Sequence, residues 1–303
     1  HIVVPAAHIT RDEVGELFEK DGISKDIGNH DPTYLTQCAR YSLRQEFIEA
    51  DAGMTGCNFG VASTGDCVVC TNEGNADMST SIPKLHIVSM GIDKVIPNYD
   101  ALAVFQRLLA RSATGQPSVS FTSQFRKARP GAEMHVILVD NGRSNIIADQ
   151  LHWRTAKCIR CGACMNTCPV YRRSMGYSYN YFIPGPIGIN LGMVHNPKKH
   201  SGNVSACSLC LSCDLVCPVK VAPGSQIYYW RQALEGFGTE NKEKKYMSVA
   251  MTELYQHPAI YSVATKYAHF ANIIPQKMMD VKLNTWSVGH DMPHFPKKTF
   301  HTL

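Results

Sequence analysis

Eight of the twelve cysteines in this 303-residue sequence occur in two copies of one pattern, which gives the clearest indication of chemistry. Both copies read Cys-x2-Cys-x2-Cys-x3-Cys-Pro, over residues 158–169 and 207–218. Three thiolates separated by two residues each can wrap one iron–sulfur cluster from a single short loop. The fourth lies before a proline, where the chain turns away. The sequence therefore predicts two [4Fe-4S] clusters as cofactors.

In two-cluster proteins with this motif, the fourth cysteine of each copy ligates the cluster of the other copy. The expected ligands of the first cluster are Cys158, Cys161, Cys164 and Cys217. The expected ligands of the second cluster are Cys207, Cys210, Cys213 and Cys168. This exchange joins the two segments into one folding unit, because neither cluster can form without both. We expect Gly162 to let its loop approach the cluster closely, and Pro169 and Pro218 to fix the loop exits.

Disulfide bonds and structural zinc are two other possible uses of these cysteines. The chain opens without a recognisable export signal, so the sequence predicts a cytoplasmic protein and argues against disulfides. Zinc modules normally pair Cys-x2-Cys units and do not place four cysteines within eleven positions. A four-thiolate zinc site nevertheless stays open as an alternative.

The segment between the two motifs indicates which kind of cluster domain to expect. Thirty-eight residues separate Cys168 from Cys207, more than compact bacterial ferredoxins use. We therefore expect the all-helical type of two-cluster ferredoxin domain. The segment carries four aromatic residues before a Pro-Gly-Pro turn, and we expect them to shield a cluster from water. They are Tyr177, Tyr179, Tyr181 and Phe182.

The elements that must position these motifs are predicted by apolar periodicity. Residues 31–50 and 99–111 are expected to be helices, the first capped by Asp31 with Pro32 at its first position. Three apolar runs, at 66–71, 85–90 and 134–139, are expected to be buried strands. Together they predict an α/β layer domain over residues 1–150.

Helical patterns dominate the remainder of the chain. We expect a helix over 225–234 and further helices over 241–280, broken at Pro258 and Pro275. The predicted domains are thus an α/β domain at 1–150, an α-helical ferredoxin domain at 151–240 and a helical and extended tail at 241–303. No apolar run approaches the ~18 residues that a membrane-spanning helix needs.

Charge is unevenly divided between the two halves. Residues 1–150 hold 13 Lys and Arg against 18 Asp and Glu, whereas residues 151–303 hold 17 against 7. A basic half suits nucleic acid, an anionic membrane surface, an acidic partner or the neutralisation of buried anionic clusters. A solvated surface rich in lysine explains the same numbers.

Other candidate residues carry weaker signals. The glycine-punctuated stretch 51–75 can cradle an anion or simply form tight turns, and Glu73 in it can line a pocket or cap a turn. No nucleotide-binding glycine motif is present. Cys67 and Cys70 lie in an apolar strand and are expected to be small core residues, and the scattered histidines to be surface groups. No set of catalytic residues is predicted.

Several of these segments also resemble a known family. Residues 51–60 (Asp-Ala-Gly-Met-Thr-Gly-Cys-Asn-Phe-Gly), 71–75, 111–116 and 139–144 are similar to the lactate-utilisation (LUD) domain. The segments 158–173, 181–188 and 295–300 fit the same family. On these residues the chain resembles the iron–sulfur subunits of bacterial L-lactate utilisation systems.

The resemblance implies a fold and a function. The first domain is expected to be related to sugar-phosphate isomerases and CoA transferases. It is also expected to be truncated at its N-terminus, because family members carry an upstream segment. The chain is expected to transfer electrons within a multi-subunit complex that oxidises L-lactate to pyruvate, with the carbon chemistry on a partner subunit. The implied partners are a cysteine-rich subunit of the heterodisulfide-reductase type and a small subunit with only a LUD domain. Peripheral contact with the inner membrane face is compatible with this, and no nucleic acid is expected.

Two alternatives remain at this stage. The chain can serve as the iron–sulfur redox subunit for another 2-hydroxy acid. It can also be a nucleic-acid-binding or sensing protein whose clusters are structural and whose basic half grips the nucleic acid.

Overall fold

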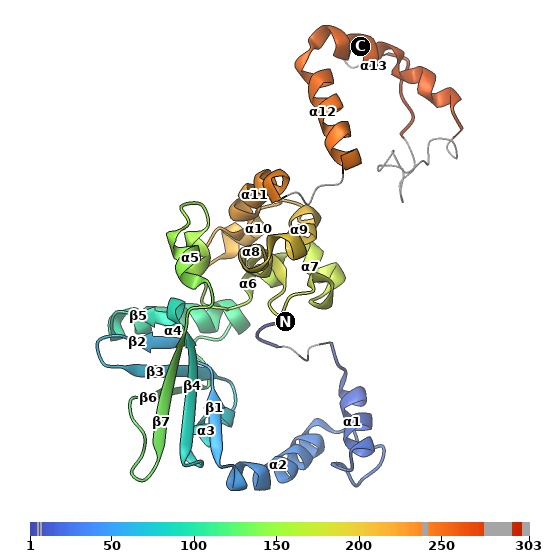
Figure 1. Ribbon diagram of the computed structural model, residues 1–303. Coiled ribbons are helices and arrows are strands. Elements are labelled where there is room, and N and C mark those ends of the chain that lie inside the picture. Colours follow the sequence, from blue (N-terminus) through green and yellow to red (C-terminus); the bar gives the residue numbers. More distant parts are fainter. Residues whose placement is uncertain (5, 7, 238–241, 276–292, 299–303) are drawn as a thin grey trace. The chain divides into compact units, whose positions relative to one another are not determined.

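The computed structural model describes residues 1–4, 6, 8–237, 242–275 and 293–298, and Figure 1 shows their helices and strands. The chain divides into two compact units, residues 1–233 and 234–303. The predicted domain boundaries at residues 150 and 240 stay a prediction.

The first unit opens with two helices that have clear capping signals. In α1 (Arg11–Lys20), Thr10 and Glu13 cap each other's backbone N–H groups in a capping box. In α2 (Pro32–Glu49), the Asp31 carboxylate accepts hydrogen bonds from two backbone N–H groups of the first turn. The predicted helix over 31–50 is therefore confirmed, including its N-terminal proline.

A parallel sheet of three strands follows, in the order β1 (Ala52–Thr55), β4 (Leu85–Gly91) and β7 (Glu133–Val139) (Figure 1). In its register Val88 of the central strand lies opposite Val136 of β7. Buried and partly buried residues alternate along β4, because successive side chains of a strand point to opposite faces of the sheet.

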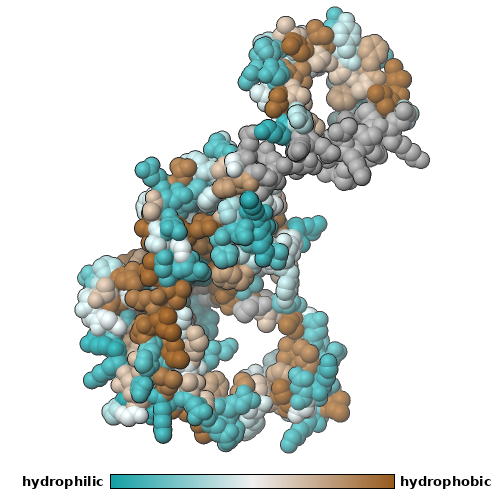
Figure 2. Space-filling model, viewed as in Figure 1, coloured by the Kyte–Doolittle hydropathy of each residue, from teal (hydrophilic) through white to brown (hydrophobic). Residues whose placement is uncertain are grey.

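The expectation that residues 134–139 form a buried strand is wrong. The segment is a strand, but Val136, Ile137 and Leu138 are 44%, 49% and 58% exposed. In the sheet β7 pairs only with β4, so it lies at the edge. An apolar run predicts a strand whether or not the same chain covers it, and Figure 2 shows the apolar side chains gathered over β4 and β7.

The second sheet is mixed and has four strands. Their order is β5 (Val95–Ile96), β2 (Phe59–Val61), β3 (Asp66–Thr71), β6 (Phe121–Phe125). β3 pairs antiparallel with both β2 and β6, whereas β2 and β5 are parallel. The short elements α3 (Asn75–Ser81) and η1 (Ile92–Lys94) connect the two sheets.

Helix α4 (Tyr99–Thr114) packs on the second sheet and forms its core. Leu102 and Leu109 of the helix belong to one cluster of buried residues with Phe59, Val61, Val68 and Ile96, all at most 7% exposed. Two residues of the first cysteine motif, Ile159 and Cys161, belong to the same core. The α/β part and the first cysteine loop therefore share one hydrophobic core.

The rest of the first unit is helical, which confirms the predicted helical character of the cluster domain. Its elements are α5 (Arg143–Ala148), η2 (Trp153–Lys157), α6 (Ala163–Thr167), α7 (Pro169–Ser174), η3 (Tyr177–Tyr179), α8 (Gly185–His195), α9 (Pro197–Ala206), α10 (Ser212–Val216) and α11 (Pro223–Ala233). Helix α8 is buried along most of its length. Asn190 of this helix donates hydrogen bonds to the carbonyl oxygens of Pro186 and Pro223, which ties α8 to α11.

Among the histidines that the structure describes, three are buried, contrary to the expectation that the histidines are surface groups. His86, His152 and His200 are 6%, 4% and 3% exposed. His86 hydrogen-bonds the Thr55 hydroxyl at 2.9 Å, and the ring of His152 stacks on Trp230 with centroids 3.7 Å apart. Periodicity gave no sign of these partners because they lie in other elements.

The second unit contains η4 (Leu234–Phe237), α12 (Lys242–Gln256), α13 (Pro258–Tyr267) and η5 (Ala268–Ile273). Pro258 is the first residue of α13, as the predicted break requires. Most of the predicted extended tail, at 276–292 and 299–303, lies outside the described residues. In the part of the chain that is described, no helix is both long and apolar enough to cross a membrane.

Candidate iron–sulfur centre

The two cysteine loops have the same backbone conformation although their sequences differ. In each loop the second and the fourth residue after the first cysteine have positive φ. In the first loop these are Arg160 (62°) and Gly162 (78°), and in the second Leu209 (53°) and Leu211 (58°). Only glycine adopts this conformation without strain, so the three other residues cost about 1–2 kcal/mol each. Such strain at a repeated position indicates a functional geometry.

Each loop ends in a helix of one turn that carries the third cysteine. Cys164 lies in α6 and Cys213 in α10. The fourth cysteine follows directly and precedes a proline. Cys168 also caps α7, where Pro169 is the first residue.

Four cysteines line each of two cavities. The first cavity is lined by Cys158, Cys161 and Cys164 of the first loop and by Cys217 of the second. The second cavity is lined by Cys207, Cys210 and Cys213 of the second loop and by Cys168 of the first. These are the two sets expected from the spacing, and ligation itself stays a prediction.

Each set of four cysteines surrounds a cavity of its own. Four thiolates around one cavity is the ligand set that a [4Fe-4S] cluster uses.

The comparisons with known proteins agree with this geometry. Residues 1–141 match the LUD domain, and residues 154–221 match the 4Fe-4S dicluster domain. The chain belongs to the proteins that join these two domains. The predicted resemblance and the two [4Fe-4S] clusters are thereby confirmed.

Relatives that share both domains cover most of this chain. It is 38% identical over 280 residues to "Lactate utilization protein B" of Oceanobacillus iheyensis, a match that covers 89% of this chain and 58% of that protein. It is 34% identical over 315 residues to "Uncharacterized electron transport protein YkgF" of Escherichia coli K12, which covers 100% of this chain and 66% of that protein. The chain therefore spans about three fifths of the length of these relatives. No solved structure matches the chain.

Backbone N–H groups of the dicluster domain point at the cysteine sulfurs. Four such hydrogen bonds have N···S distances of 3.3–3.5 Å, and each loop contributes two cysteine acceptors. They run from Arg160 to Cys158, from Tyr171 to Cys168, from Leu209 to Cys207 and from Val221 to Cys217. Hydrogen bonds to ligating sulfurs stabilise negative charge there and raise a cluster's reduction potential.

Burial makes Cys161, Cys164, Cys207 and Cys213 weaker acids than an exposed cysteine. It raises the pKa of Cys164 to about 12, and neighbouring thiols add to the effect. Burial likewise raises the pKa of Cys161, Cys207 and Cys213. Because iron binds the thiolate, cluster assembly must release these protons.

Helices α8 and α11 line both cavities of the dicluster domain. Ile187 of α8 lines the first cavity, and Ile189 lines the second. Gly224 of α11 lies so close to the second cavity that an added Cβ would be 3.2 Å from the Cys213 sulfur. The Asp214 carboxylate fixes this end of α11 by accepting hydrogen bonds from the N–H and hydroxyl of Ser225.

The expected aromatic cover is only partly present. Tyr179 is 5% exposed and lines the second cavity. Tyr177 and Phe182, in contrast, are 83% and 78% exposed, and Tyr181 lines a different cavity. The expectation is wrong for these three residues. Tyr177 and Tyr179 lie at opposite ends of the 3-10 turn η3, and Asn180, in the left-handed conformation, redirects the chain before Tyr181 and Phe182.

Lys94 is a residue near the first cluster loop that sequence reasoning missed. Its ammonium donates a 2.7 Å hydrogen bond to the carbonyl oxygen of Cys158. Burial lowers the pKa of Lys94 to about 8. Lys94 lies 64 residues before Cys158 in the chain, so no motif could have linked the two.

The cysteines of the LUD domain take no part in either cavity. Cys67 is 2% exposed and belongs to the core, as expected, and Cys70 is partly buried against the same core. The Cys57 thiol donates to the carbonyl oxygen of Phe59 at 3.0 Å. Glu73 is exposed, and its carbonyl oxygen accepts a hydrogen bond from the Thr71 hydroxyl, as in a capped turn.

Proposed function

We propose that this chain is the electron-transfer subunit of an L-lactate utilisation complex. The observation that carries the proposal is the gathering of eight cysteines around two cavities in a dicluster domain that follows a LUD domain. Relatives with the same arrangement are named for lactate utilisation or for electron transport. When bound, [4Fe-4S] clusters supply reversible one-electron transfer.

We infer that the ligand sets are those expected from the spacing. Cys158, Cys161, Cys164 and Cys217 hold the first cluster, and Cys207, Cys210, Cys213 and Cys168 hold the second. The two cavities and the four N–H···S hydrogen bonds support this assignment. None of the twelve cysteines forms a disulfide in the structure, so all eight of the motif cysteines are available as ligands.

The second cluster is the better placed of the two for exchange with a partner. Cys210 is exposed, whereas the four cysteines around the first cavity are buried or partly buried. Apolar residues follow Cys210 in the chain, and two of them, Leu211 and Leu215, are 44% and 82% exposed. We infer that a redox partner docks here, and that this partner is the cysteine-rich subunit of the complex. The carbon chemistry then lies on a partner chain.

The test is to purify the full-length protein with its partner subunits under anaerobic conditions and add 2-hydroxy acids. L-Lactate is expected to bleach the visible absorption of the clusters, as dithionite does, whereas D-lactate and glycolate do so far more slowly. If dithionite bleaches the clusters and no hydroxy acid does, the lactate function is wrong while the electron-transfer role survives. A colourless protein that holds zinc and no acid-labile sulfide would overturn both.

A further inference from the structure

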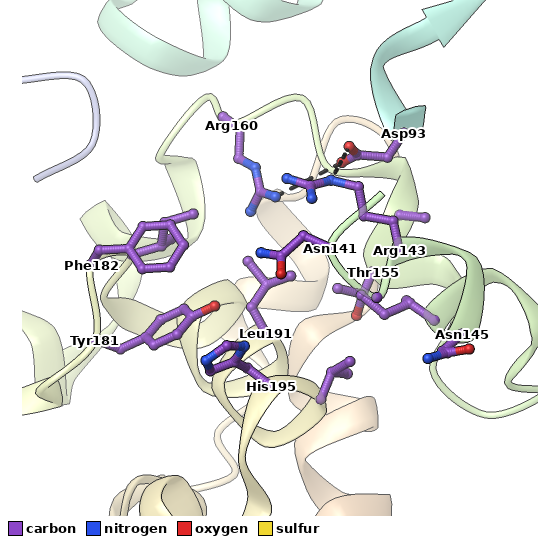
Figure 3. Close-up of a pocket in the computed structure, with 15 residues that line it drawn as sticks. Asp93, Asn141, Arg143, Asn145, Thr155, Arg160, Tyr181, Phe182, Leu191 and His195 are labelled. Carbon is purple, nitrogen blue, oxygen red and sulfur yellow. Dashed lines mark hydrogen bonds and ion pairs between the residues drawn. The ribbon is translucent and has the colours of Figure 1, made fainter. Parts of the chain in front are cut away.

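A third cavity, of about 250 Å³, lies beside the first cysteine loop (Figure 3). The LUD side contributes Asp93, Asn141 and Arg143. The dicluster side contributes Arg160, which lies within the first cysteine motif, and six residues between 181 and 195, among them Tyr181, Leu191 and His195. The cavity is distinct from the two that the cysteines line, and the motifs do not account for it.

One end of the cavity has an excess of positive charge. The Asp93 carboxylate is 3% exposed and pairs with Nε of Arg143 at 2.7 Å. Its contact with Nη2 of Arg160 is looser, at 3.8 Å. Two guanidinium groups therefore face a single carboxylate, as Figure 3 shows.

Arg160 also has an unused donor at this end. Its Nη1 atom is buried and has no hydrogen-bond partner among the described residues. A buried charged donor without a partner is costly, whereas a bound anion would satisfy it. Guanidinium groups bind carboxylates particularly well because two parallel hydrogen bonds can form.

The other side of the cavity offers polar groups to a second oxygen and apolar groups to carbon. Figure 3 shows the Tyr181 hydroxyl and the His195 ring close together, with the Asn141 amide between them and the arginines. The ring centroids of Tyr181 and His195 are 6.4 Å apart. Leu191 and Val194 add apolar surface. The volume falls below the roughly 300–1,000 Å³ of pockets for drug-sized ligands, so only a small molecule fits.

We propose that this cavity binds a small carboxylate with a hydroxyl or keto group on C2, such as lactate or pyruvate. The carboxylate lies against Arg160 and Arg143, and the C2 oxygen lies against His195, Tyr181 or Asn141. This identification of the ligand rests on the proposed function. Because Arg160 is two residues from Cys158, the bound molecule lies against the loop that wraps the first cluster.

The first test is binding to the full-length protein with both clusters, measured by calorimetry under anaerobic conditions. L-Lactate and pyruvate are expected to bind. L-Lactamide, which has the same shape without the charge, is expected to bind at least 10-fold more weakly. Propionate, which lacks the C2 oxygen, is expected to bind about 2- to 10-fold more weakly than lactate. Binding of lactate is also expected to shift the electron paramagnetic resonance signal that the first cluster gives after reduction by dithionite.

Two variants locate the binding site. Arg160→Gln is expected to weaken lactate binding by roughly 10- to 100-fold. Arg173→Gln removes an exposed arginine of α7 outside the cavity and should leave binding unchanged. His195→Leu keeps both arginines and is expected to abolish the preference for lactate over propionate. His195→Leu keeps the test valid if Arg160→Gln loses its cluster.

The proposal is overturned if lactate does not bind, if phosphate binds more tightly than lactate, or if both site variants bind as the wild type does. Failure of the site and failure of the function are distinguishable. If lactate reduces the clusters of the complex without binding this chain, the cavity proposal alone is wrong. If lactate binds here and the clusters of the complex stay oxidised although dithionite reduces them, the cavity proposal stands and the proposed oxidation of lactate by the complex is wrong.

Discussion

The proposed ligand sets predict which of the two clusters each cysteine substitution removes. Cys217 lies in the second motif but lines the first cavity. Cys217→Ser is therefore expected to remove the first cluster and leave the second, because a cluster rarely survives the loss of a thiolate. Iron analysis should fall from about eight to about four atoms per chain. The resonance spectrum should match that of Cys164→Ser.

The matched control is Cys38→Ser, since Cys38 lies in α2 away from both cavities. This variant should keep the full iron content. A Cys217→Ser protein that resembles Cys213→Ser instead would show that the loops do not exchange their last ligand.

At the scale of residues, the sequence predicted only those parts of the site whose members are set by spacing within short segments. The cysteine sets follow from spacing within two short loops, so the sequence was enough to group them. The arginine cavity joins Asp93, Arg143, Arg160 and His195 from four separate elements. Nothing in their spacing brings them together, because tertiary packing does so.

At the scale of elements, the approach of α11 to the second cavity depends on the absence of a side chain at Gly224. A Cβ there would lie 3.0 Å from the Asp214 carboxylate and 3.2 Å from the Cys213 sulfur. Gly224→Ala is expected to destabilise the holoprotein by about 1–2 kcal/mol and to speed loss of the second cluster. Thermal unfolding and the decay of visible absorption measure the two effects.

Gly202→Ala is the control, since this glycine lies in α9 with nothing near its added Cβ. It should be neutral or slightly stabilising, because alanine favours helix. Equal behaviour of the two variants would mean that α11 does not pack closely on the cluster.

The second sheet is stabilised by an ion pair between the buried Asp66 and the exposed Arg126, and its pH dependence is predictable. Asp66 is buried, and its hydrogen bonds from Arg126, with one from Thr64, hold the pKa of its carboxyl well below its usual value of 3.8. A lowered pKa stabilises the fold above pH 3.8, and this stability is lost as the pH falls further. Asp66→Asn should cost about 2 kcal/mol at pH 7. Denaturant unfolding should show that the difference from wild type shrinks below pH 3.8. A constant difference would contradict the role of ionised Asp66.

A helix or strand was predictable where its own segment carries the capping residues or the apolar pattern of that element. The Asp31-Pro32 cap and the apolar spacing of residues 99–111 identified α2 and α4. Apolar runs identified β3 and β4 in the same way. The exposure of β7 was not predictable, because the run 134–139 carries no information about what covers it.

At the scale of the whole molecule, the proposed function requires a surface where electrons leave. Leu215 is 82% exposed beside the loop of Cys210, and Val216 is 41% exposed. Leu215→Glu is expected to slow lactate-dependent reduction in the complex at least 10-fold, because a charge disrupts an apolar contact. Its iron content and its reduction by dithionite should stay unchanged. Leu17→Glu, at an exposed position in α1, is the control, and a similar slowing there would argue against a docking surface at Leu215.

Ile159 and Cys161 of the first cysteine loop pack with Phe59 and Val61 of the second sheet. This packing couples the folding of the α/β part to the placement of the first cysteine loop. During synthesis the strands of both sheets leave the ribosome before residue 158 does. The core of the second sheet includes residues of the first cysteine loop, so it is complete only when that loop is in place. If the loop holds a cluster as proposed, we expect iron supply to affect the folding of the second sheet as well as electron transfer. Iron starvation should then leave a polypeptide that is sensitive to proteases from its first strands onward.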